Sequence, residues 1–177
     1  MNWLLVMVRG SLICGVLFSP GLLAWGQVVG DEAEMNRLYD KAEEAIANGD
    51  PEGAAMSSGR AALMASQLAK QAQQTSVVQL LKGNEALFRG HEQAYRALAL
   101  FNRAGGQPPA STGVCRSIDS ARHEIRRAVD LLAIDVTNLP TTTQVRQAQR
   151  WHDVATGWVK MVAGLANDFQ CGSVAPP

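Results

Sequence analysis

Apolar residues recur at alternating intervals of three and four positions along most of the chain after residue 30. This spacing places them on one side of an α-helix, because a helix completes a turn in about 3.6 residues. No segment alternates apolar and polar residues in the manner of a half-buried strand. The pattern therefore predicts an all-α fold, an antiparallel bundle of four to five helices.

Turn-forming residues divide this pattern into five helical segments. The first covers about residues 31–48 and stops at Asn48-Gly49. The second begins at Asp50-Pro51, because Asp caps a helix and Pro suits its first position. The third has its apolar positions over residues 77–101 and ends before the Gly-Gly-Gln-Pro-Pro of residues 105–109. We expect the second and third helices either to run unbroken through Gly83 or to bend there.

Two cysteines belong to the last two helices. The fourth helix is expected to begin after Ser111 or Thr112 with an apolar face that reaches Val136, and the fifth to run from about residue 141 to 169. The connection through Asn138-Leu139-Pro140 is short, so these helices should form an antiparallel hairpin. Cys115 opens the fourth helix and Cys171 follows the fifth, which brings both to the same end of the hairpin. The sequence therefore predicts that a Cys115–Cys171 disulfide closes this hairpin.

The N-terminal residues resemble an export signal more than a part of the fold. Arg9 precedes an apolar run over residues 12–18, Ser19-Pro20-Gly21 breaks it, and small residues stand at Ala24 and Gly26. We predict a signal peptide over residues 1–26, a helical domain over 27–172 and a flexible tail over 173–177. The translation start, Met1 or Met7, stays open. The predicted location is the periplasm or the medium outside the cell.

Composition limits the classes of partner. The chain is 47% apolar and 18% charged, and its 16 basic residues balance its 16 acidic ones. A balanced chain has no bulk attraction to nucleic acid, so no nucleic-acid partner is expected. We also expect no integral membrane span once the signal has been removed.

The charges are unevenly distributed. Residues 31–52 contain eight acidic and two basic residues, whereas the rest of the mature chain is basic. One interpretation is that the acidic first helix lies against the basic faces of the third and fourth helices. The other is that it forms an acidic patch for a partner.

A line of cations marks a candidate partner-binding surface. These cations recur every seven residues, on the outermost side of the third helix: Lys82, Arg89, Arg96 and Arg103. Such a line could dock an acidic partner or a phosphate-rich surface, or it could be an ordinary solvated helix face.

Polar residues on the apolar seam are candidates for helix register or for a pocket. Asn84 and His91 occupy seam positions of the third helix, where a polar group can fix register. Trp158 lies on the seam of the fifth helix, and a pocket beside it could hold a small apolar ligand. A haem held between His91 and Met161 is a variant of this alternative.

Chemistry is otherwise hard to find in the sequence. The histidines show none of the helical spacings that place metal ligands on one face, so no metal or other cofactor is predicted. No catalytic motif is present, so we name no catalytic residue and expect no enzyme. The hypothesis is an exported envelope protein that acts as a non-enzymatic interaction or scaffolding component, with an unknown envelope or secreted partner. The alternative is a helical bundle that binds a small apolar ligand or haem.

Overall fold

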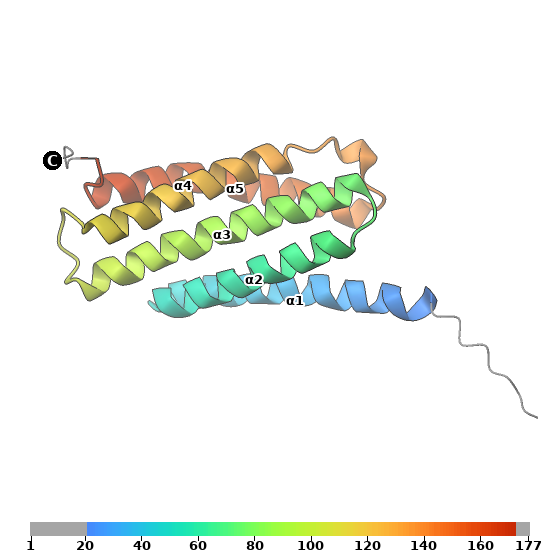
Figure 1. Cartoon of the computed structure of the whole chain (residues 1–177), viewed down its shortest axis with the longest axis horizontal. Helices are drawn as coiled ribbons and strands as arrows, with labels where there is room; N and C mark the ends of the chain where they lie inside the picture. The colour runs from blue at the N-terminus through green and yellow to red at the C-terminus, as the bar shows by residue number, and fades with distance from the viewer. Residues whose placement is uncertain (1–20, 173–177) are drawn as a thin grey trace, which may run out of the picture.

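The protein is an antiparallel bundle of helices arranged in two layers (Figure 1). The structure, a computed structural model, describes residues 21–172 and the side chains of residues 31–172. Its helices are α1 (Gly21–Ala47), α2 (Pro51–Gln71), α3 (Thr75–Arg103), α4 (Thr112–Leu132), the short 3-10 helix η1 (Val136–Asn138) and α5 (Thr142–Asp168). Helices α2, α3 and α4 lie side by side, with α1 and α5 behind them (Figure 1). The described residues contain no strand, and the predicted all-α bundle is confirmed.

Helix α1 begins earlier than the sequence pattern predicted. It starts at Gly21 and continues through Gly26, the predicted end of the signal peptide. Residues 1–20 and the predicted tail over 173–177 lie outside the described residues, so these assignments stay predictions. The end of α1 is as expected, because Gly49 has a φ of 76° and takes the left-handed conformation that ends a helix.

The boundary between α2 and α3 corrects the expectation at Gly83. The helices separate at residues 72–74, where Ala72 and Gln74 have extended backbones, and Gly83 lies inside α3. A Cβ atom at Gly83 would lie 2.6 Å from Leu132 Cδ2, and one at Gly90 would lie 2.5 Å from Ile125 Cδ1. These glycines therefore allow α3 and α4 to approach closely, and neither bends the helix.

Polar side chains cap α2, α4 and α5 at their N-termini. The Asp50 carboxylate accepts a hydrogen bond from the Gly53 N–H at 2.8 Å, as the sequence predicted for α2. Ser111 and Thr141 cap α4 and α5 in the same way. Helix α4 ends at Leu132, earlier than predicted, and Val136 begins η1 instead.

The core consists of two parts of different character. Small residues fill the seams of α2, whose buried positions are mostly Ala, Ser and Gly. Larger rings fill the space that α3 shares with α1 and α5. This aromatic cluster comprises Tyr39, Phe88, His91, Tyr95, Trp151 and Trp158. Helix α3 thus packs against α2 on one side, α4 on another and the aromatic cluster on a third. Its remaining side faces solvent.

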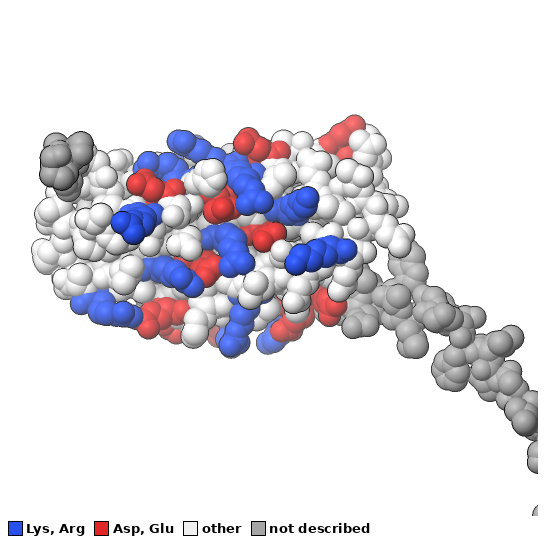
Figure 2. Space-filling view, viewed as in Figure 1, with Lys and Arg blue, Asp and Glu red and all other residues white. Residues whose placement is uncertain are grey.

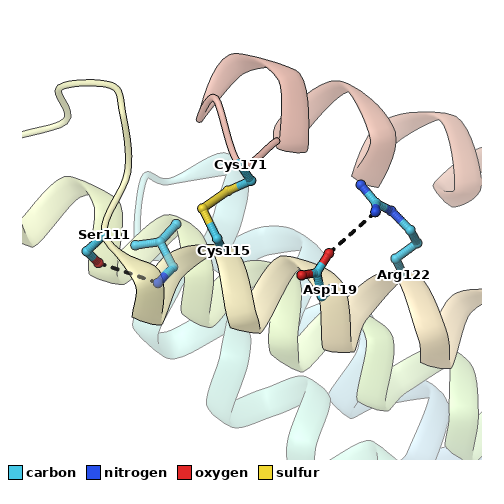
Figure 3. Close-up of a disulfide and its surroundings, with 6 residues drawn as sticks. Ser111, Cys115, Asp119, Arg122 and Cys171 are labelled. Atoms are coloured by element: carbon cyan, nitrogen blue, oxygen red, sulfur yellow. Dashed lines mark hydrogen bonds and ion pairs between the residues drawn. A yellow bond between two sulfur atoms is a disulfide. The ribbon is translucent and has the colours of Figure 1, made fainter. Parts of the chain in front are cut away.

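The predicted disulfide closes the α4–α5 hairpin (Figure 3). Cys115 and Cys171 are bonded, with Cα atoms 5.2 Å apart. Gln170 has a φ of 54°, and the Cys171 N–H donates to the Ala166 carbonyl at 2.9 Å. This is the Schellman arrangement, which reverses the chain after α5 and turns Cys171 toward α4. The same end is tied to α3 by Phe101, whose ring stacks on Phe169 at 4.2 Å between centroids.

Removal of the disulfide should destabilise the protein substantially. The bridge links residues 56 positions apart. By the loop-entropy estimate, the Cys115→Ser/Cys171→Ser variant should lose about 4 kcal/mol of unfolding free energy. Denaturant titration of the variant beside the unreduced wild type measures the difference. An unchanged midpoint, or free thiols in the native protein, would contradict the prediction.

Candidate functional site

The predicted line of cations lies on the solvent-facing side of α3. Because they recur every seven residues, Lys82, Arg89, Arg96 and Arg103 follow one side of the helix, opposite the aromatic cluster. This side belongs to the face formed by α2, α3 and α4. Figure 2 shows Lys and Arg side chains across that face, with acidic side chains between them. We call it the basic face.

A buried carboxylate that sequence reasoning missed holds two of these arginines. Glu92 is buried in the seam between α2 and α3, and it pairs with Arg89 at 3.1 Å and with Arg96 at 2.6 Å. Gly59 of α2 makes room for it, since a Cβ atom there would lie 3.0 Å from Glu92 Cδ. The sequence contained a signal for these ion pairs, because Glu92 lies three positions after Arg89 and four before Arg96, the spacings at which helical side chains pair. Glu92 therefore orients both guanidinium groups on the basic face.

The other two cations differ from each other in their surroundings. Arg103 pairs with Glu52, which stands in the first turn of α2. Lys82 forms no ion pair with any residue that the structure describes. The line thus combines one unpaired cation with two arginines that share a single carboxylate, and it carries excess positive charge.

A shallow groove opens on the basic face beside Arg96 and Arg103. Its volume is about 390 Å³, and two side chains in it are unusually exposed for apolar residues, Met56 at 65% and Leu100 at 39%. The remaining lining residues are Glu52, Ala55, Gln93, Ala99 and Ser117. The sequence indicated neither Met56 nor Leu100. A signal existed, because Met56 and Leu63 are apolar residues seven positions apart on the outer side of α2.

The acidic segment does not lie against the basic faces of α3 and α4, so that interpretation was wrong. Helix α1 packs on α2, and Asp40 lies 3.9 Å from Arg150 of α5. Among the described residues of the segment, Glu52 alone pairs with a cation of α3 or α4. The reason is topological, because α1 lies in the layer behind the basic face (Figure 1).

The polar seam residues are buried, and two of the three lie together. The His91 ring packs on Trp158 with 4.0 Å between centroids, and Tyr95 contacts both rings. Asn84 is also buried, two helical turns before His91. Side chains of α3 thus occupy the seam beside Trp158, where the sequence suggested a ligand pocket. Met161 is 52% exposed and His91 is wholly buried, so the two do not share an internal haem site.

Burial controls the protonation of His91. Neither ring nitrogen has a hydrogen-bond partner among the described residues, and desolvation lowers the pKa of His91 to about 3. The imidazole is therefore neutral near pH 7. Asn84 Oδ1 and Trp151 Nε1 also lack partners.

Two other classes of site find no support in the part of the chain that the structure describes. It contains no cluster of three His, Cys, Asp or Glu side chains that could hold a metal ion. None of its helices is long and apolar enough to cross a membrane. Comparisons with protein-family models, with curated proteins and with solved structures gave no match.

The buried imidazole predicts acid sensitivity. The unfolded chain takes up a proton on His91 below about pH 6.5, whereas the folded chain does so only near pH 3. The stability that depends on neutral His91 is fully present above pH 6.5 and falls by about 1.4 kcal/mol per pH unit toward pH 3. Unfolding free energies should be measured from pH 7 to 4 for wild type and His91→Phe. As the pH falls, the wild type should lose stability relative to His91→Phe at that slope. Parallel curves would show that His91 titrates normally in the fold.

Proposed function

We propose that this protein is an exported, non-enzymatic interaction component of a cell envelope, and that the groove on the basic face is its docking surface. The observation that carries the proposal is the exposure of Met56 and Leu100 in one groove beside Arg96 and Arg103. Methionine and arginine are enriched in protein interfaces. Apolar side chains gathered in a groove and rimmed by charge are typical of a binding site.

Export is supported by the N-terminal sequence and by the disulfide. Residues 1–26 have the charge, the apolar run and the small residues of a secretory signal. The Cys115–Cys171 disulfide suits an oxidising compartment, because cytosolic thiols are kept reduced. The two features are independent of each other, and both favour the periplasm or the extracellular medium.

The groove favours this proposal over a ligand-binding bundle. A ligand bundle needs free space inside its seam. At Trp158 that space is taken by His91 and Tyr95. The groove, in contrast, is open to solvent and accessible to another protein.

The mature N-terminus tests export. Protein recovered from its source envelope or medium should begin at Gln27, because the small residues Ala24 and Gly26 stand where signal peptidase cleaves. Edman degradation or intact mass identifies the first residue. Retention of Met1 or Met7 in all of the recovered protein would contradict it.

Affinity capture tests the docking surface. Mildly crosslinked wild-type protein, captured from its native envelope, should retain a second protein. A Met56→Glu variant should lose it by at least about tenfold, because a loss of ~1.4 kcal/mol follows from a charge placed in an apolar contact. Met161→Glu is the matched control, since Met161 is similarly exposed but lies on α5. Repeated recovery of the wild type alone would refute the interaction role.

A further inference from the structure

The front layer of the molecule has a clear charge preference. Helices α2, α3 and α4 together contain ten Lys and Arg residues and six Asp and Glu residues. On α3, four cations extend over 21 residues, a line of about 32 Å. The complement of such a surface is acidic.

The arginines at the groove have hydrogen-bonding capacity left for a ligand. Arg96 uses Nη2 to reach Glu92, and Arg103 uses Nη2 to reach Glu52. A guanidinium group has five N–H donors, so each arginine retains several. Both side chains are more than half exposed, at 57% and 66%. The Arg103–Glu52 pair is exposed on both sides and therefore weak, so a carboxylate from a partner can replace Glu52 there.

The surface around the groove selects the conformation of its occupant. All of the lining residues belong to α2, α3 and α4, whose backbone groups are hydrogen-bonded within the helices. Such a surface offers no row of backbone donors and acceptors to an extended peptide, unlike a sheet edge. The described residues that line the groove include no aromatic side chain, so they also lack the feature that recognises polyproline segments. A helical segment forms its backbone hydrogen bonds internally. It therefore needs neither backbone partners nor aromatic side chains in the groove.

The size of the groove agrees with a short helix. Its lining on α3 extends from Gln93 to Arg103, which corresponds to about 15 Å along the helix axis. A partner helix of about ten residues covers that length. Apolar residues spaced three and four apart would reach Met56 and Leu100 along it.

We infer that the occupant of the groove is an acidic amphipathic helix of another envelope protein. Its apolar side chains contact Met56 and Leu100, and its carboxylates pair with Arg96 and Arg103. The inference rests on the proposed function, because it names the partner of the same docking surface.

Photo-crosslinking tests the inference in the full chain. A benzophenone amino acid is placed at position 56, with position 161 as the matched control, and the protein is expressed in its source cells. Mass spectrometry of the crosslinked peptide should identify a segment rich in Asp and Glu, with apolar residues at helical spacing. Arg96→Gln/Arg103→Gln should lower the yield at position 56 by at least about tenfold, or ~1.4 kcal/mol. The charge-matched control, Arg146→Gln/Lys160→Gln on α5, should leave the yield unchanged.

The remaining outcomes separate the two proposals. A crosslink from position 56 to lipid, or to a neutral or basic segment, would overturn the acidic-helix inference. A partner captured by the wild type but crosslinked only from position 161 would overturn the inference and the groove as the docking surface, and would leave only the general interaction role intact. No partner by either method would overturn both. Arg103→Gln alone leaves the Glu92 pairs untouched, so a reduced yield in that variant is not a consequence of misfolding.

Discussion

The close approach of α3 to its two neighbours is the constraint on which the rest of the molecule depends. Gly83 and Gly90 let side chains of α4 occupy the space where Cβ atoms would stand, and Gly59 of α2 does the same for Glu92. Three helices can therefore lie side by side as a thin layer (Figure 1). The two faces of this layer differ in polarity and in exposure to solvent. One is covered by α1 and α5 and contains the aromatic cluster, and the other is the basic face.

This division explains how an electrically balanced chain can present a directional surface. The acidic α1 lies behind the layer, so its carboxylates do not neutralise the cations of α3. The carboxylates that do pair with these cations belong to α2 and α3: Glu52 pairs with Arg103, and the buried Glu92 orients both Arg89 and Arg96. The groove forms where the exposed side chains of Met56 and Leu100 lie beside Arg96 and Arg103. The close packing at Gly59, Gly83 and Gly90, between the helices of the layer, thus brings together the side chains that form the groove.

The sequence predicted the architecture well, because periodicity and capping are local properties. The helical seams, the Asp50 cap and the Cys115–Cys171 bridge each followed from residues close together in the chain or from a short connection. The role of Gly83 did not follow from the sequence. A glycine that bends a helix and a glycine that makes room for a neighbouring helix cannot be told apart from sequence alone. The burial of Glu92 depends on Gly59, thirty-three positions away. The periodicity of a sequence does not predict which residues of two different helices face each other. The groove was missed for the same reason, since α2, α3 and α4 all contribute to it.

Hydroxyl-radical footprinting of the methionines tests the central claim, that the groove on the basic face is the docking surface. Met56 and Met161 share the same side-chain chemistry and are both largely exposed, whereas Met35 is buried and reports on folding. In the complex captured from the envelope, oxidation of Met56 should fall at least about tenfold relative to the free protein, while that of Met161 stays the same. Protection of Met161 with Met56 still reactive would place the partner on α5 and contradict the account.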